Sequence, residues 1–579
     1  MNLRSRSNIL PIIFLIIISI FALKDLLKPG LYTSHDGETH TARIAQYYQA
    51  ILDGQFPPRF AGSFYNGFGS PIFVYIYPLP YMLGSVIHLA GFSFTNSFKL
   101  LMALSYIFSG IFSYLWLKEL FKNRQAAFLG AMFYMFSPYR LQLIYVRGSI
   151  SEHLAYAFLP LALLFITKFK GEKSMKLIAM CALSISAIML SQNLVAFIAL
   201  PVLILYSIII DPNPKSAKVL KPTLLAVIWG LFISSFTYIP AIFERNLIKF
   251  DEVFKLVYGS HFVTIKQLIR SPWGYGFDLP GTVNDQMSFQ LGLAHILVLL
   301  LGLLLIGTIF FVRRRRGNNI NINIPTDYRI ASFAYLMIVI CLFLVIDSEA
   351  TKLTWKYFSV IQVIDIPWRI LGLIPLFTAV IASFVIVRTR SGAIFIFLIF
   401  ALIVANRNHV RINKSLAFTD ADFINYAGTA TQLSEFTPKA RNSVSSPAFT
   451  DKTLPVTVVG GWAKFENIAS TSKKIAFKVT VISKKAQLRI NKFYFPGIQV
   501  KAYNKDTYVP VEFGSFSTGE TRLDTTKDTN GFIFMPLHNG TYNMEVIFGE
   551  TPTRQLANAI SLIFLSISLF FLVKHGKQL

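Results

Sequence analysis

The sequence predicts a polytopic α-helical membrane protein that carries an all-β domain before its last membrane span. Three observations predict this fold class. Of the 579 residues, 54% are hydrophobic and 15% are charged, and the mean hydropathy is +0.52. Apolar runs of membrane length recur along most of the chain. From about residue 410 onward, short stretches alternate between apolar and polar side chains, which is typical of strands in a soluble sheet.

The formal net charge of +26 could suggest a nucleic-acid partner. The basic residues, however, mostly fall in short clusters between apolar runs, as cytoplasmic loops of membrane proteins require. We therefore interpret them as topology signals and expect no nucleic-acid partner. The two cysteines, Cys181 and Cys341, lie inside apolar runs, which argues against a disulfide framework and a Cys-based metal site.

The basic clusters predict the topology. Arg4 and Arg6 precede the first apolar run, and no small-x-small cleavage site follows it, so we expect a retained span with its N-terminus inside. Every later cluster then lies inside if the apolar segment 72–90 does not cross but lies at the membrane surface or re-enters. This gives about twelve spans, near 9–26, 98–117, 125–138, 152–167, 176–191, 194–210, 222–242, 289–312, 330–346, 369–387, 392–405 and 556–573.

Three regions follow from this topology. Residues 1–405 form a transmembrane domain with a structured first exterior loop, 24–97, and residues 555–579 form the last span with a short cytoplasmic tail. Between them, residues 406–554 form an exterior β domain, for which we expect a sandwich of about 130 residues with turns at Asn530-Gly531 and Asn539-Gly540. We expect a multi-pass protein of the plasma membrane with both termini in the cytoplasm.

The candidate chemistry lies in the first exterior loop, where two carboxylates, Asp36 and Glu38, stand between His35 and His40. Apolar residues at helical spacing follow, so Asp36 would stand at a helix start. A structural interpretation makes Asp36 an N-cap and Glu38 a first-turn partner of the helix dipole. A functional interpretation makes the carboxylate a general base, or a ligand of a divalent cation such as Mg²⁺ or Mn²⁺. The two interpretations are compatible.

Further charged residues stand where predicted spans meet the outer face. A guanidinium matches a phosphate group bidentately, so the arginines could bind a lipid phosphate. The structural alternative for each is a lipid-headgroup anchor or a partner for a carboxylate such as Asp365. The candidate substrate- and phosphate-binding residues are Arg43, Arg140, Arg147, Glu152, Glu244 and Arg369.

Several short motifs, each weak alone, occur in an order that indicates a family. They are His35-Asp36-Gly37-Glu38-Thr39-His40 with Arg43, Phe68-Gly69-Ser70-Pro71, Tyr77-Pro78-Leu79-Pro80-Tyr81, Ser137-Pro138-Tyr139-Arg140, Arg147-Gly148-Ser149 with Glu152, Ile239-Pro240-Ala241 with Glu244, Ile366-Pro367-Trp368-Arg369 and Phe493-Tyr494-Phe495-Pro496-Gly497. The chain resembles the GT-C superfamily of membrane glycosyltransferases. More narrowly, it resembles the YfhO-like and 6-pyruvoyl-tetrahydropterin synthase-related membrane proteins.

This resemblance implies an inverting enzyme that transfers a hexosyl or pentosyl group from a polyprenyl-phosphate donor, at the outer face, to an envelope glycopolymer or lipid acceptor. The first-loop base of the superfamily maps onto Asp36, and Glu38 fits its variable acidic pair. One departure is Ser191-Gln192-Asn193, where relatives often carry His before the Asn. The nine scattered histidines do not suit the zinc site of pterin chemistry, and the absence of a Trp-Trp-Asp cluster argues against transfer to protein asparagine.

Two other functions stay open at this stage. A transporter or flippase of a lipid-linked substrate would carry charges in mid-span and inverted repeats, neither of which is evident. A non-catalytic envelope scaffold would depend on its β domain and not on Asp36.

Overall fold

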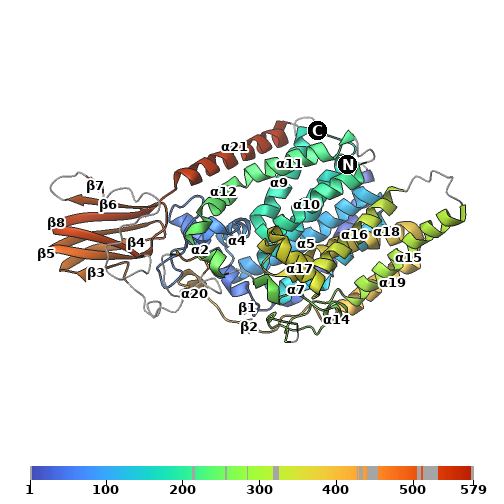
Figure 1. The fold of residues 1–579 in the computed structure, drawn as a ribbon, viewed down its shortest axis with the longest axis horizontal. Helices are drawn as coiled ribbons and strands as arrows, with labels where there is room; N and C mark the ends of the chain where they lie inside the picture. Colours follow the sequence, from blue (N-terminus) through green and yellow to red (C-terminus); the bar gives the residue numbers. More distant parts are fainter. Residues whose placement is uncertain are drawn as a thin grey trace.

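The computed structural model describes residues 3–211, 216–253, 257–282, 284–316, 325–426, 428, 435–439, 454–504, 510–512 and 532–574. It consists of a helical body, with a β-sheet at one end (Figure 1). The start of α1 and the end of α21 lie at the same end of the helical body, away from the sheet.

Long helices packed side by side make up the helical body. Each predicted span overlaps one of them, but six described helices are long and apolar enough to cross a membrane, or seven if one bent pair is a single span. The sequence-based number of twelve therefore stays a prediction. The helices are α1 (Leu3–Ala22), α5 (Phe94–Phe121), α6 (Arg124–Met135), α8 (Ile150–Lys168), α9 (Met175–Ser191), α10 (Asn193–Ile210), α11 (Leu220–Ile233), α12 (Ser235–Glu244), α15 (Leu293–Arg316), α16 (Thr326–Val345), η6 (Pro367–Leu373) with α18 (Ile374–Thr389), α19 (Gly392–Asn406) and α21 (Pro552–Lys574).

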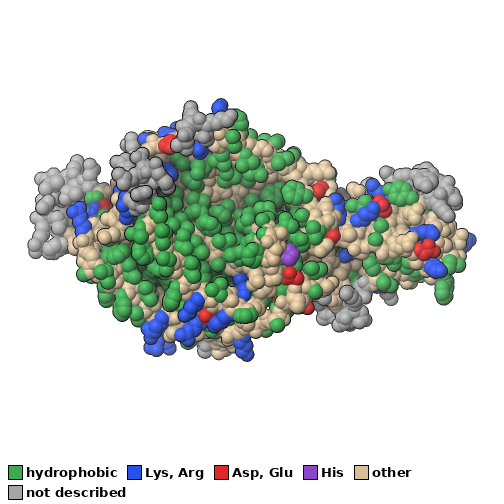
Figure 2. Space-filling view, turned by 180° about the vertical axis from the view of Figure 1, so that it is seen from behind, with side chains coloured by type: hydrophobic (Ala, Val, Ile, Leu, Met, Phe, Trp, Pro, Cys, Tyr) green, Lys and Arg blue, Asp and Glu red, His purple; other side chains and the backbone are tan. Residues whose placement is uncertain are grey.

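The outside of this body is apolar over a broad area, with Lys and Arg gathered near its borders (Figure 2). Exposed apolar side chains include Ile396 and Phe400 on α19 and Leu562 on α21, each at least 65% exposed. Such a surface suits lipid and not water.

The span predicted at 222–242 is bent. Helices α11 and α12 meet at 69° around Ser234. There the Ser234 hydroxyl donates back to the Gly230 carbonyl, and the Ser235 hydroxyl bonds to the Ala557 carbonyl of α21. Serines that bond to backbone carbonyls in this way commonly bend a helix.

Short elements fill the predicted exterior loops. Helix α4 has 11 residues and covers about 16 Å, less than the hydrocarbon core of a bilayer; that 72–90 does not cross stays a prediction. The segment between the predicted spans 125–138 and 152–167 contains a buried helix, α7, which starts at Pro138 because proline suits the first helical position. These elements are η1 (Lys24–Leu27), β1 (Leu31–Tyr32), α2 (Gly37–Leu52), α3 (Ile72–Tyr75), α4 (Leu79–Leu89), α7 (Pro138–Tyr145), η3 (Arg245–Leu247), α13 (Phe250–Val253), η4 (Val257–Ser260), α14 (Ile265–Ile269), α17 (Glu349–Tyr357), η5 (Ser359–Val363), β2 (Ser415–Leu416) and α20 (Asp420–Ile424).

The C-terminal strands form one antiparallel sheet in the described residues, so the prediction of a two-sheet sandwich is wrong for this part of the chain. The order is β3-β5-β8-β6-β7, and β4 also pairs with β5. The alternation of apolar and polar side chains predicted after residue 410 is confirmed at the start of β5, since Ile475, Phe477, Val479 and Val481 are buried on one face. The strands are β3 (Val456–Gly460), β4 (Ala463–Ser470), β5 (Lys474–Phe493), β6 (Ile498–Asn504), β7 (Pro510–Glu512) and β8 (Phe532–Phe548).

The turn predicted at Asn539-Gly540 is also wrong, because β8 continues through it. The Asn539 side chain donates to the carbonyls of Val481 and Ile482, and so ties the irregular point of β8 to that of β5. The turn predicted at Asn530-Gly531 lies outside the described residues.

The predicted β domain of 406–554 comprises two parts. Before the sheet begins, the chain returns to the helical body, where β2 pairs with β1 and α20 packs against α2. The sheet itself rests on the loop between α2 and α3, with the rings of Phe68 and Phe493 5.7 Å apart and the Lys492 ammonium 3.1 Å from the Gly62 carbonyl.

Candidate functional site

Two chain segments far apart in sequence run side by side at the predicted outer end of the helices. The backbone N–H of His35 donates to the Val146 carbonyl at 3.1 Å, and that of Asp36 donates to the Arg147 carbonyl at 2.8 Å. Gly148 permits this approach, because its φ is +61° and a Cβ there would lie 2.3 Å from the Ser34 hydroxyl oxygen. Asp36 and Arg147 are therefore held next to each other by backbone contacts.

Asp36 occupies the residue before α2, as predicted, but its carboxylate accepts no capping hydrogen bond. The prediction that the Asp36 side chain caps the helix is therefore wrong. The predicted start of α2 is right, and Glu38 does lie in its first turn. Asp36 is partly exposed, so its carboxylate is accessible to a ligand.

Arg147 and Glu152 form a buried ion pair beside Asp36. The guanidinium is 2.6 Å from the carboxylate, and the two side chains are 5% and 2% exposed. Tyr139 donates its hydroxyl to the other oxygen of Glu152. Burial opposes the charge of Arg147, but Glu152, Tyr139 and Asp36 more than offset it and raise the pKa of Arg147 above its usual range. Arg147 is therefore a permanent cation at this site.

Trp368 and Asp278 extend the cluster on the far side of Arg147. The guanidinium lies 4.9 Å above the Trp368 ring, whose Nε1–H donates to Asp278 at 2.9 Å. His261 lies 3.0 Å from the same carboxylate. Burial opposes ionisation of Asp278, but His261 and Trp368 offset it and hold the pKa of Asp278 below its usual value. Asp278 was not predicted as a site residue; its only signal in the sequence is a carboxylate just after Trp273-Gly274-Tyr275-Gly276.

Arg369 completes the group that the structure brings together. It forms a two-pronged bond with Asp365, at 2.9 and 3.1 Å, and its carbonyl oxygen lies 3.3 Å from the Tyr139 hydroxyl oxygen. Its charge is close enough to interact with Arg147 and Glu152. Of the predicted residues, Asp36, Arg147, Glu152 and Arg369 thus share one site, which we call the Asp36 cluster.

Glu38 and Arg43 lie on α2, outside this cluster. Glu38 accepts from the Tyr426 hydroxyl at 3.0 Å, and Arg43 donates to the Tyr81 hydroxyl at 3.2 Å. Tyr81 also contacts His40 at 3.1 Å. Burial lowers the pKa of His40 to about 3, so this histidine is neutral at physiological pH.

Arg140 and Glu244 lie elsewhere. Arg140 is fully buried between the rings of Tyr134 and Tyr156 and donates to the His153 carbonyl, which gives it a place in the core. Glu244 pairs with the buried Arg554 at 2.6 Å, where α12 meets α21. The geometry favours a structural role for both.

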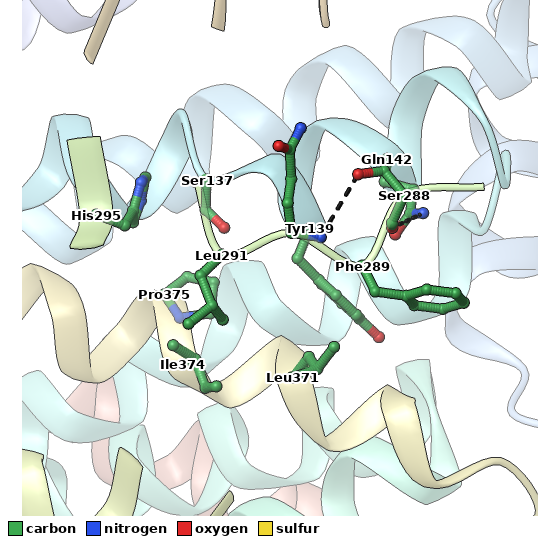
Figure 3. A pocket seen from close by; sticks show the side chains of 11 residues that line it. Ser137, Tyr139, Gln142, Ser288, Phe289, Leu291, His295, Leu371, Ile374 and Pro375 are labelled. Carbon is green, nitrogen blue, oxygen red and sulfur yellow. Dashed lines mark hydrogen bonds between the residues drawn. The ribbon is translucent and has the colours of Figure 1, made fainter. Parts of the chain in front are cut away.

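A small cavity of about 20 Å³, room for one water molecule, lies beside Tyr139 (Figure 3). Gln142 closes one side through a 2.6 Å hydrogen bond to the Ser288 carbonyl, and Leu371 and Ile374 line another. Tyr139 therefore stands between this cavity and Glu152.

The divalent cation that the sequence suggested at Asp36 and Glu38 stays a prediction. Glu38 is bonded to Tyr426, away from the cluster, and no group of three His, Cys, Asp or Glu side chains with suitable geometry occurs in the described part of the chain.

The arrangement combines one accessible carboxylate with two arginines whose charges are held in place by carboxylates. Asp36 can accept a proton from a hydroxyl, and Arg147 and Arg369 can stabilise negative charge that develops nearby. Three of these groups stand at helix starts, since Asp36 precedes α2, Glu152 lies in the first turn of α8, and Arg369 lies in η6.

Residues 73–412 match a family described as "6-pyruvoyl-tetrahydropterin synthase related domain; membrane protein". The chain belongs to this family. The match covers the helical body from α3 to the end of α19, and so includes Arg147, Glu152 and Arg369, whereas Asp36 precedes it. The family assignment made from the short motifs is confirmed.

Several solved structures match part of this chain at low identity, with TM-scores below 0.5. A mutant of arabinofuranosyltransferase AftD from Mycobacteria has a TM-score of 0.45 at 13% identity, over 68% of this chain and 27% of that one. Oligosaccharyltransferase AglB from Archaeoglobus fulgidus, in complex with an inhibitory peptide and a dolichol-phosphate, has a TM-score of 0.40 at 14% identity, over 73% and 56%. ArnT from Cupriavidus metallidurans, bound to undecaprenyl phosphate, has a TM-score of 0.28 at 14% identity, over 66% and 78%. The chain thus spans about a quarter of AftD and about half of AglB. No curated protein matches the chain in sequence.

Proposed function

We propose that this protein is an inverting membrane glycosyltransferase that takes a sugar from a polyprenyl-phosphate donor at the outer face of the plasma membrane. The acceptor is an envelope glycopolymer or a lipid. The observation that carries the proposal is the Asp36 cluster, in which a carboxylate that makes no capping hydrogen bond lies beside Arg147, and Arg147 is close enough to Arg369 for their charges to interact. The donor class comes from the resemblance of the sequence motifs to the GT-C superfamily.

In this proposal Asp36 is the general base. It accepts the proton of the acceptor hydroxyl while the hydroxyl oxygen forms a bond to the anomeric carbon of the sugar. The bond between that carbon and the phosphate oxygen breaks, and the electron pair leaves with the polyprenyl phosphate. A single displacement of this kind inverts the anomeric carbon.

The arginines serve the leaving group. As the bond breaks, negative charge develops on the phosphate, and a guanidinium fixed in advance stabilises it without reorganisation. Glu152 and Trp368 hold Arg147, and Asp365 holds Arg369, so both are already ordered. Glu152 is a positioning residue, since its two oxygens are taken by Arg147 and Tyr139.

The test is sugar transfer by the full chain, reconstituted in lipid nanodiscs with a panel of radiolabelled polyprenyl-phosphate hexoses and pentoses and a membrane extract as acceptor. We expect Asp36→Asn to lower the rate by about 10²–10⁴-fold, the usual contribution of one positioned base. The matched control is Asp251→Asn, which removes an exposed carboxylate paired with Arg245. A folded Asp36→Asn variant that transfers at the wild-type rate would remove Asp36 from the mechanism.

The alternatives make different predictions in the same preparation. A flippase would move a labelled polyprenyl-phosphate sugar between leaflets with no acceptor present and form no glycosylated product. A scaffold would lose its function on removal of the sheet and keep it with Asp36→Asn.

A further inference from the structure

A second pocket lies at the other end of the helices that carry the Asp36 cluster. Helix α8 begins next to Glu152 and ends at Lys168, and the segment η6–α18 begins next to Arg369 and ends at Thr389. The 19 residues of α8 cover about 28 Å, close to the thickness of the hydrocarbon core. The pocket therefore faces the opposite leaflet, on the side of the basic loops.

This pocket has a volume of about 380 Å³ and lies where α5, α8, α16 and α18 meet. Basic side chains outnumber acidic ones three to one in its lining, and Thr326 and four apolar side chains form the rest of its wall. The lining residues are Leu120, Phe121, Lys170, Thr326, Asp327, Ile330, Val387, Arg388 and Arg390.

The positive charge of the pocket is only partly neutralised from within. Arg388 forms a two-pronged bond with Asp327, which accounts for the one carboxylate. Lys170 and Arg390 form no ion pair with the described residues. Burial, with the charges of Lys122 and Arg329, lowers the pKa of Lys170, so neighbouring cations act on this ammonium group.

A helix start adds to this positive field. Helix α16 begins at Thr326 in the pocket lining, and the preceding Pro325 provides no side-chain cap. The first backbone N–H groups of a helix have no partner within it and favour an anion. A phosphate in the pocket can therefore meet N–H groups, an ammonium and a guanidinium together.

We propose that this pocket binds the phosphate of an anionic phospholipid in the leaflet of the basic loops. Basic residues in cytoplasmic loops set the topology whether or not they line a pocket. The pocket is therefore the observation that indicates a ligand. Basic pockets between membrane helices commonly take lipid headgroups. The apolar side chains of the wall, Leu120, Phe121, Ile330 and Val387, suit the glycerol and acyl part of a lipid. They would contribute nothing to the binding of inorganic phosphate. This proposal does not depend on the transferase activity.

The experiment uses the full chain in phosphatidylcholine nanodiscs with increasing phosphatidylglycerol, and native mass spectrometry to count each lipid retained. We expect wild type to retain phosphatidylglycerol preferentially. Lys170→Gln/Arg390→Gln should weaken this retention about thirtyfold, because each basic residue at a membrane surface contributes about a fivefold effect. The charge-preserving pair Lys170→Arg/Arg390→Lys should keep it.

The matched control is Lys173→Gln/Lys221→Gln, which removes one lysine from the loop after α8 and one from the first turn of α11, both outside the pocket. Equal losses in both double variants would show diffuse attraction and overturn the proposal. So would wild type with no preference for phosphatidylglycerol. A third arm titrates inorganic phosphate: displacement of the lipid by phosphate at comparable concentration would make the ligand a soluble anion and overturn the lipid assignment.

Discussion

Gly148→Ala tests whether the Asp36 cluster depends on the close approach of two chain segments. The structure predicts two separate penalties for this methyl group. The backbone at Gly148 has φ +61°, a conformation that L side chains adopt at a cost of about 1–2 kcal/mol. The added Cβ would also lie 2.3 Å from the Ser34 hydroxyl oxygen, 2.9 Å from Ser34 Cβ and 3.0 Å from the Gly37 backbone nitrogen.

The second penalty acts directly on the site. Overpacking of this kind costs about 1–3 kcal/mol, so the expected total loss of stability is about 2–5 kcal/mol. Part of the overlap can be relieved if residues 34–37 move away from residues 146–148. That movement lengthens the hydrogen bonds from His35 and Asp36 to the opposite segment and displaces Asp36. A displacement of 1 Å at a reacting group costs about 10²-fold in rate.

Denaturant unfolding in detergent micelles, followed by circular dichroism, measures the loss of stability. The transfer assay measures the loss of rate that results from the displacement of Asp36. Gly91→Ala is the matched control, because Gly91 also has a positive φ, +100°, but no atom lies within 4 Å of an added Cβ. The difference between the two variants isolates the contact with Ser34 and Gly37. The reasoning is refuted if Gly148→Ala is no less stable than Gly91→Ala and transfers sugar at the wild-type rate.

Two further predictions concern stability. His40 has a pKa lowered from 6.5 to about 3, so the unfolded chain binds more protons than the folded one between these values, and stability falls as the pH drops through this range. At pH 5 the lowered pKa of His40 reduces the free energy of unfolding by about 2 kcal/mol relative to neutral pH. His40→Gln should therefore lose less stability than wild type on acidification, as measured by denaturant unfolding. A variant whose stability depends on pH as that of wild type does would contradict the lowered pKa. Glu244→Ala leaves the buried Arg554 without its carboxylate and should cost about 3–5 kcal/mol in denaturant unfolding, whereas Asp251→Ala, which breaks an exposed pair, should cost less than about 1 kcal/mol. If Glu244→Ala instead keeps wild-type stability and loses transfer, Glu244 belongs to the site after all.

Local patterns were enough to predict the helical body. Apolar length places a helix because backbone polar groups must be satisfied within the segment in lipid, and this holds for α8 and α18 without any knowledge of their neighbours. Alternation likewise predicted which residues of β5 face the core, since successive side chains of a strand point to opposite faces. The same local signals missed the bend at Ser234, because bonds to α21 support it.

The sequence by itself determined that this chain is a membrane protein of helices with a terminal sheet, that a helix starts after Asp36, and which charged residues stand at helix ends. Only the tertiary structure decided which of these charges meet. Arg147 and Arg369 join Asp36, Arg140 enters the core, and Glu244 pairs with Arg554 more than three hundred residues away in sequence. The physical reason is that ion pairing and burial depend on distance in space, which local periodicity does not carry.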